Sequence, residues 1–261
     1  MLVADLLDSL DEQFPTANAA SWDPVGLQLG DPARDVGTVG VVHEITDDAV
    51  ASAISGGVTT LVSYHPLLFA PVTSLTAGPS AGGRTLRLLE AGVSVIVIHT
   101  ALDAAPTGTG DALLASLGID TVGRFAEAED NSGSLIGRYG QLPDEMTGDA
   151  FAATVAEVLN AAVRVAGDGS AVVHTIAVVP GSGSSYLDEA AGISDVYVTG
   201  DVSHHRARSG SDRGLVVVDA GHIPTERPGV EYLYDSVRNL VSDAVFIACD
   251  PHPWKDVSWK T

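Results

Sequence analysis

Histidine and acidic residues follow several short apolar runs of this chain, at the points where those runs end. Two of these clusters share a spacing, with an imidazole four residues before a carboxylate: His99 with Asp103, and His222 with Glu226. His65 follows a third apolar run. Imidazole nitrogen and carboxylate oxygen together suit divalent ions such as zinc, iron, manganese or magnesium. A carboxylate can also bridge two ions about 3.5–4 Å apart, which can then clamp both the attacking and the leaving oxygen of a hydrolysis.

A fourth cluster joins Asp201 to His204 and His205 after the run Val196–Thr199. For any one of these pairs alone, the alternative is a helix-capping carboxylate beside a histidine that serves the fold. Several such clusters at strand ends favour a ligand site, because the carboxyl ends of parallel strands meet at one edge of a sheet. The sequence therefore predicts one metal site assembled from both halves of the chain.

The elements that must position these residues are short strands that alternate with helices. Strands are expected at 39–42, 59–63, 93–98, 162–165, 174–179, 196–199, 215–219 and 244–248. Helices are expected at 2–14, from the cap Thr46 to the pair Gly56-Gly57, and at 83–90, 111–117, 147–159, 186–191 and 226–240. This order predicts the α/β class, with mostly parallel sheets and crossover helices. The stretch 121–142 differs, because its polar, alternating pattern indicates antiparallel edge strands.

The two halves of the chain have similar layouts, and no low-complexity linker divides them. We expect an N-terminal α/β lobe over 1–125 and a C-terminal α/β lobe over 126–261, which together form one integrated unit. No repeat is visible at the level of single residues.

The net charge of −21 is extreme for 261 residues, and only two lysines are present. Excess carboxylate with almost no lysine is typical of a protein that stays soluble in concentrated salt, which screens its self-repulsion. We expect the cytoplasm of a halophile. An acidic partner-binding tail is the alternative, but the carboxylates are spread along the chain. The absence of any basic run argues against nucleic-acid binding, and no apolar run approaches the length of a membrane span.

Six segments together resemble one protein family along essentially the whole chain. The segments are Trp22-Asp-Pro-Val-Gly-Leu-Gln-Leu-Gly30, Leu61-Val-Ser-Tyr-His65-Pro-Leu-Leu-Phe69, His99-Thr-Ala-Leu-Asp103-Ala-Ala-Pro, Gly181-Ser-Gly183, Tyr197-Val-Thr-Gly-Asp201-Val-Ser-His-His205 and Asp219-Ala-Gly-His222-Ile-Pro-Thr-Glu226. The chain resembles the Nif-three-like dinuclear-metal toroid proteins, often labelled GTP cyclohydrolase 1 type 2 homologs, in their short form.

The resemblance implies two facing α/β lobes in a homo-hexameric ring, with one or two divalent ions per chain between the lobes. His65, Asp103 and Glu226 would hold one ion, and Glu226 would bridge to a second ion held by His222 and by the first residue of a His-His-Pro pair. That first histidine is Tyr64 here, and a neutral phenol is a poor ligand. The second ion is then weaker, absent, or held with help from His99, unless Tyr64 binds as a phenolate whose pKa the ion itself lowers.

The remaining polar residues near these motifs receive secondary roles. His99 and His205 are expected to line the pocket and carry protons, and the alternative for His205 is a purely structural histidine. Asp201 is expected to cap a helix or to orient a ligand, and Glu44 to support one. The turn 181–185 either cradles a phosphate or serves only as a flexible turn. His174 and His252 have no supporting motif around them and are expected to be structural or exposed.

Three classes of function fit these residues. The leading hypothesis is a metal-dependent hydrolase of a nucleotide-like or other phosphorylated small molecule. The family's cyclohydrolase label fits such chemistry, in which ring C8 is lost as formate after attack by water, although no motif reads guanine. The alternatives are a metal-binding or metal-delivering protein, and a ring scaffold whose ions are structural.

Overall fold

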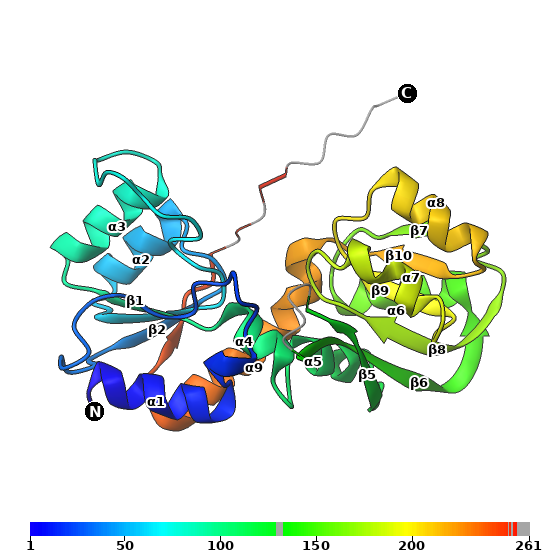
Figure 1. Cartoon of the computed structure of the whole chain (residues 1–261), viewed down its shortest axis with the longest axis horizontal. Coiled ribbons are helices and arrows are strands. Elements are labelled where there is room, and N and C mark those ends of the chain that lie inside the picture. Colours follow the sequence, from blue (N-terminus) through cyan, green and yellow to red (C-terminus); the bar gives the residue numbers. More distant parts are fainter. Residues whose placement is uncertain (129–132, 250, 252, 255–261) are drawn as a thin grey trace.

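The computed structural model contains two β-sheets that lie side by side in an elongated molecule and are joined through a central group of helices (Figure 1). It describes residues 1–128, 133–249, 251 and 253–254. His252 and both lysines, Lys255 and Lys260, lie outside the described residues.

Five strands form the first sheet, in the order β1-β4-β3-β2-β11. Their bounds are β1 Gly26–Leu29, β2 Val39–Val42, β3 Thr60–Ser63, β4 Ser94–Val97 and β11 Val245–Phe246. Neighbouring strands are parallel, except that β1 runs antiparallel to β4. Every residue of β2, β3 and β4 is buried, as expected for strands with helices on both faces.

Helices cover both faces of this sheet with two separate apolar clusters. On one face, α2 (Asp47–Ser55) and α3 (Ala81–Glu90) pack on residues such as Leu61 and Val95. On the other face, α1 (Val3–Gln13) packs on residues such as Val62 and Ile96. The expected cap of α2 is present, because the Thr46 hydroxyl accepts a hydrogen bond from the Ala49 N–H.

Six strands form the second sheet, in the order β5-β6-β8-β9-β10-β7. Their bounds are β5 Thr121–Glu127, β6 Leu135–Thr147, β7 Arg164–Ala166, β8 Val172–Val178, β9 Val196–Thr199 and β10 Val216–Asp219. The central strands β8, β9 and β10 are parallel, whereas β5, β6 and β7 join antiparallel. The flanking helices are α5 (Thr109–Ser116) and α6 (Gly148–Val158) in one cluster, and α7 (Leu187–Ala190) and α8 (His204–Asp212) in the other.

The long helix α9 (His222–Leu240) connects the two halves. It begins directly after β10 of the second sheet, and its last turns contribute Val230, Leu233 and Val237 to the core beneath the first sheet. The chain then adds β11 beside β2. The C-terminal segment therefore returns to the first sheet. No single boundary in the sequence separates the strands of the first sheet from those of the second.

The α/β class with crossover helices is confirmed, and the expected antiparallel pair within 121–142 is present as β5 and β6. One strand and two α-helices were not expected from the sequence: β1, α8, and the short helix α4 (His99–Ala104). The strand β1 lies in a stretch whose glycines, Gly26 and Gly30, indicate a loop in the sequence. In the structure both glycines have positive φ and lie at the two ends of the strand. The helix α8 is polar and contains glycine, so it has no apolar period to reveal it.

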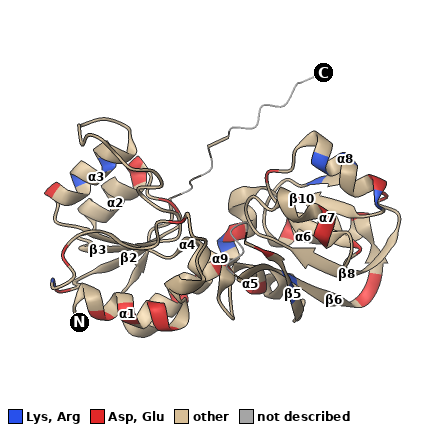
Figure 2. Ribbon diagram, viewed as in Figure 1, with Lys and Arg blue, Asp and Glu red and all other residues tan. Residues whose placement is uncertain are grey.

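Acidic side chains occur on elements of both halves, and basic ones are few (Figure 2). Among the described residues, no helix is both long enough and apolar enough to cross a membrane.

Candidate metal centre

Three side chains from distant segments meet where the two halves of the molecule join. His43 follows β2, His65 follows the neighbouring parallel strand β3, and Glu226 lies in the second turn of α9. The parallel register continues past the strands, because the His65 N–H donates to the His43 carbonyl at 2.9 Å. The two imidazoles therefore stack, with ring centroids 5.2 Å apart. The carboxylate of Glu226 reaches them across the junction.

Both imidazoles point to one oxygen of Glu226. Nε2 of His43 lies 2.8 Å from Glu226 Oε2, and Nε2 of His65 lies 3.1 Å from the same oxygen. The three ligand atoms lie within 4.8 Å of one another. Two imidazole nitrogens and a carboxylate oxygen that converge in this way form a donor set typical of zinc and related divalent ions. The residues present thus fit a divalent ion.

The other oxygen of Glu226 faces a third histidine. Nε2 of His222 lies 3.0 Å from Glu226 Oε1, and its Nδ1 lies 2.7 Å from Asp201 Oδ2. The hydrogen bond to Glu226 raises the pKa of His222 to about 9, although burial acts in the opposite direction. Burial alone would raise the pKa of Glu226, but hydrogen bonds from His222, His43 and His65 hold that pKa well below its usual value. Glu226 is thus a buried anion whose two oxygens are both used.

Tyr64 points to Asp103. Its hydroxyl donates to Asp103 Oδ1 at 2.8 Å, and the Thr109 hydroxyl donates to the same oxygen at 2.6 Å. Burial raises the pKa of Asp103, and burial followed by the charges of Asp103 and Glu226 raises the pKa of Tyr64 well above 10. Tyr64 is therefore a neutral hydrogen-bond donor, and Asp103 is the carboxylate that accepts from it. The pair lies beside His43, His65 and Glu226, which we call the triad. Asp103 and Glu226 line the same cavity, although Asp103 is outside the set of converging ligand atoms.

His99 is held by Asp23, a residue far away in sequence. Nδ1 of His99 lies 2.9 Å from Asp23 Oδ2, which also accepts from the N–H and the hydroxyl of Thr100. Burial alone would raise the pKa of Asp23, but its bonds to His99 and Thr100 keep that pKa low. His99 has a φ of +32°, a strained conformation that persists when surrounding contacts fix it and that clusters at functional sites. Because Asp23 occupies Nδ1, Nε2 of His99 is left for the cavity.

His205 is placed apart from this group. It is exposed on α8, where its ring packs against that of His204 at 5.4 Å, and it lines neither cavity beside the triad. Asp201 orients His222 and does not cap a helix. Glu44 lines the larger cavity. In the turn 181–185, the N–H groups of Gly181 and Gly183 donate to threonine hydroxyls.

The sequence interpretation left out His43 and Asp23. His43 carries the same signal that identified His65, an imidazole directly after a buried strand, but the adjacent Glu44 was given the supporting role instead. Asp23 carries no local signal, because its partners His99 and Thr100 are 76 and 77 residues away.

Gly181 allows Glu226 to reach its position. A Cβ at residue 181 would lie 2.4 Å from Glu226 Oε1, and the φ of Gly181 is +67°. Gly214 has a similar φ of +81°, but a Cβ there would meet nothing within 4 Å. An alanine at either position would strain the backbone, but only an alanine at position 181 would also displace the Glu226 carboxylate.

We expect both Gly181→Ala and Gly214→Ala to lose about 1–2 kcal/mol of unfolding free energy, because each forces alanine into the left-handed region. Only Gly181→Ala is expected to weaken zinc binding, by about tenfold or more, since displacing a ligand's support has effects of that size. Urea unfolding and competition with a chelator measure the two quantities. Equal zinc affinities in the two variants would contradict this assignment.

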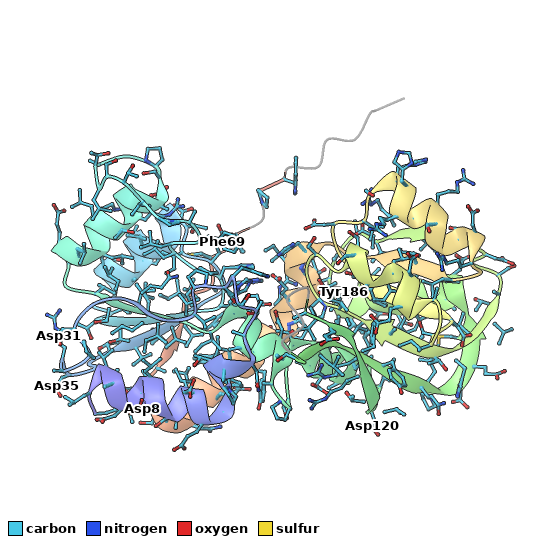
Figure 3. All side chains as sticks on the ribbon, in the orientation of Figure 1. Asp8, Asp31, Asp35, Phe69, Asp120 and Tyr186 are labelled. Atoms are coloured by element: carbon cyan, nitrogen blue, oxygen red, sulfur yellow. The ribbon has the colours of Figure 1, made fainter. Side chains whose placement is uncertain are left out.

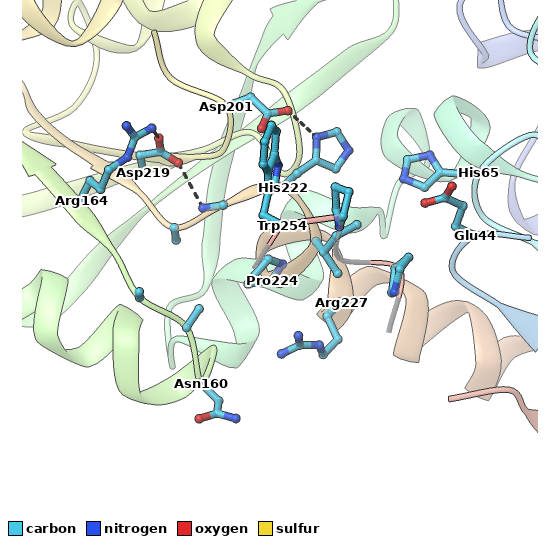
Figure 4. A pocket seen from close by; sticks show the side chains of 17 residues that line it. Glu44, His65, Asn160, Arg164, Asp201, Asp219, His222, Pro224, Arg227 and Trp254 are labelled. Atoms are coloured by element: carbon cyan, nitrogen blue, oxygen red, sulfur yellow. Dashed lines mark hydrogen bonds and ion pairs between the residues drawn. The ribbon is translucent and has the colours of Figure 1, made fainter. Parts of the chain in front are cut away.

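Two cavities border the triad and share His65 and His222 in their walls. The larger has a volume of about 850 Å³ and also contains Arg164, Asp201 and Arg227 (Figure 4). The smaller has a volume of about 280 Å³ and is lined by residues from both halves of the molecule. A ligand in either cavity would lie beside the same cluster of histidines.

Known proteins resemble this chain over nearly its whole length. The model of the family Duf34/NIF3 (NGG1p interacting factor 3) matches residues 1–253. A GTP cyclohydrolase 1 type 2 homolog of Streptomyces coelicolor is 33% identical over 237 residues, covering 88% of this chain and 83% of that protein. The crystal structure of Staphylococcus aureus protein SA1388 has a TM-score of 0.88 and 27% identity, covering 98% of this chain and 99% of the other. The Bacillus cereus protein related to NIF3, 20% identical and with a TM-score of 0.87, has the same fold over 98% of this chain and 99% of its own. The family match, the identity to the Streptomyces relative and the shared fold together show that the chain belongs to the Duf34/NIF3 family.

Proposed function

We propose that this protein is a metal-dependent hydrolase of a nucleotide-like or other phosphorylated small molecule. The observation that carries the proposal is the convergence of His43, His65 and Glu226 beside two cavities. A bound divalent ion supplies Lewis-acid activation of water for attack on phosphorus or on a ring carbon. The name of the Streptomyces relative, a GTP cyclohydrolase 1 type 2 homolog, points to the same class of chemistry.

The larger cavity supports a phosphorylated substrate. In a chain with 13 basic and 34 acidic residues, two arginines line this one cavity (Figure 4). Arg164 pairs with Asp219, whereas Arg227 donates from Nη1 to the Leu159 carbonyl at 3.0 Å and forms no ion pair with another described residue. Arginine is well suited to bind phosphate oxygens.

The roles of the single residues form part of the same proposal. We assign Asp103, His222 and Tyr64 to the ion in addition to the triad, as the family resemblance implies, with the number of ions being one or two. His99 is the proton carrier of this proposal, because Asp23 fixes its ring beside the cavity. His205, expected from the sequence as a second carrier, lines neither cavity and receives no role at the ion. A homo-hexameric ring and a cytoplasmic location complete the proposal.

Removal of the metal tests the proposal. Protein stripped with a chelator and then reloaded with zinc, iron, manganese or magnesium is assayed in molar salt against a panel of nucleotides and phosphoesters. Turnover is expected to disappear on stripping and to return with at least one metal. Turnover that survives complete stripping would contradict a metal-dependent mechanism.

A metal carrier without turnover is the second candidate. It is favoured by one observation: position 64, where the family resemblance implies a histidine ligand, is a tyrosine whose hydroxyl donates to Asp103. The second ion of a two-metal mechanism would therefore lack one imidazole. Stoichiometric transfer of zinc to an acceptor chelator, with no turnover of any compound in the panel, would support this candidate over the hydrolase.

A further inference from the structure

The smaller cavity differs from the larger one in its charge. Among its described lining residues there is no lysine or arginine, and its acidic members are Asp103 and Glu226. Both arginines near the cluster belong to the larger cavity. A phosphoryl group would find guanidinium partners only in the larger cavity, because the described lining of the smaller one offers none. The smaller cavity therefore suits the part of a ligand that carries no phosphate.

Aromatic side chains line and border the smaller cavity. Trp22 is 51% exposed and packs against Phe69, itself 59% exposed, with ring centroids 5.7 Å apart. The Trp22 ring also meets His99 edge-on at 6.2 Å. Tyr186 lines the cavity from the other half of the molecule, and Figure 3 shows Phe69 and Tyr186 at the facing borders of the two halves. Aromatic rings that line the cavity from both halves, Trp22 and Tyr186, suit a planar aromatic ligand, because aromatic rings stack favourably.

Polar groups suited to the edge of such a ring also line this cavity. The side chains of Asn18, Ser182 and Ser185 make no hydrogen bond with another described side chain or backbone group, although each can both donate and accept. The volume of about 280 Å³ is just below the range of about 300–1,000 Å³ that holds whole drug-sized ligands. The cavity thus suits one ring system and not an entire nucleotide.

We propose that the smaller cavity binds an uncharged planar nitrogen heterocycle of nucleobase size, stacked on Trp22, with Ser182 and Ser185 contacting its polar edge. This inference rests on the proposed function, since it names the part of the substrate that lies beside the ion. The ring is then held against His99 and Glu226, which line the same cavity. Any phosphoryl group of the substrate would extend toward the arginines of the larger cavity.

Binding of hypoxanthine and inosine to the zinc-loaded full chain tests this inference without requiring turnover. Ligand-observed NMR and calorimetry are expected to detect both compounds. Trp22→Leu is expected to weaken them about tenfold or more, because stacking of a base on an aromatic side chain has effects of that size, and Trp22→Tyr is expected to retain most of the affinity. Ser182→Ala provides a second, smaller loss at the edge of the ring.

Phe246→Leu is the matched control, because Phe246 is an exposed aromatic residue of β11 that lines neither cavity. Its affinity for inosine is expected to equal that of the unmodified protein. The inference is overturned if neither compound binds to the unmodified protein. It is also overturned if Trp22→Leu binds both compounds with the affinity of the unmodified protein, whether or not light scattering shows a change in its assembly mass. Ring binding without turnover of any substrate would instead leave this inference standing and overturn the hydrolase.

Discussion

In Glu226→Gln, zinc is expected to bind more than about 100-fold more weakly than to the unmodified protein. Loss of a residue that merely orients a metal ligand already weakens binding about 10–100-fold, and Glu226 is itself the group that all three histidines face. Nε2 atoms of His43 and His65 share one of its oxygens, and His222 faces the other. Glutamine keeps the size of the side chain but removes the negative charge.

The same variant has a second readout in metal-free protein. The hydrogen bond to Glu226 is the largest cause of the raised pKa of His222, about 9 against an ordinary 6.5. In Glu226→Gln this pKa is expected to fall toward its ordinary value, which NMR titration of the imidazole protons measures. A metal-free pKa that stays near 9 would show that Asp201 alone raises it.

The loss of stability in metal-free Glu226→Gln is expected to depend on pH. The lowered pKa of Glu226 contributes stability above its ordinary value of 4.5, and this contribution disappears as the pH falls. The raised pKa of His222 contributes stability that is complete below 6.5 and disappears as the pH rises through about 9. The difference in unfolding free energy is therefore expected to be largest between about pH 5 and 6.5 and to shrink toward pH 9.

Glu231→Gln is the matched control, since it makes the same chemical change on the exposed side of the same helix. It is expected to keep both the zinc affinity and the pKa of His222. Equal weakening of zinc binding in the two variants would mean that net charge, and not the position of Glu226, determines affinity.

The buried parallel strands could be predicted from the sequence because each reads as a short, mostly apolar run rich in β-branched residues. The bounds of β2 and β9 agree with the expected ranges, and β3, β4 and β10 differ at their ends by a residue or two. The positions of His65, His99 and His222 follow from those runs, because each lies where a buried strand has just ended. The edge strand β1 could not be predicted, since its residues are only half buried and glycines flank it.

The partners of the site residues could not be predicted in the same way. The contacts between site side chains depend on their rotamers and on the path of α9 between the two sheets. Neither of these produces a pattern in the local sequence. Tyr64 shows this, because its place in the sequence says only that a phenol replaces an imidazole, whereas the structure turns its hydroxyl to Asp103. Asp23 shows it too, because its loop carries no sign that it will hold His99.

A buried arginine joins the two halves close to the centre. Arg138 of β6 is fully buried, and its Nε donates to Asp111 Oδ2 at 2.6 Å. Its Nη1 donates to the carbonyls of Leu135 and Gly137, and its Nη2 donates to the carbonyl of Ala105 at 2.7 Å, just after α4. The guanidinium thus ties the second sheet to the helix that carries Asp103.

Arg138→Met is expected to lower the free energy of unfolding by about 3–5 kcal/mol, because removing one partner of a buried ion pair leaves the other charge uncompensated. Methionine fills much of the volume but donates no hydrogen bond to the carbonyls that Arg138 reaches, which include that of Asp103 at 3.4 Å. Arg124→Met is the control: Arg124 is exposed on the adjacent strand β5 and, among the described residues, its side chain makes one hydrogen bond, to the Pro106 carbonyl, so a change within about 0.5 kcal/mol is expected. Urea unfolding at fixed salt compares the two, and Arg138→Lys, which keeps the charge without the planar fork, is expected to fall between them. If Arg138→Met were no less stable than Arg124→Met, the junction would depend on the apolar packing of α9 and not on this guanidinium.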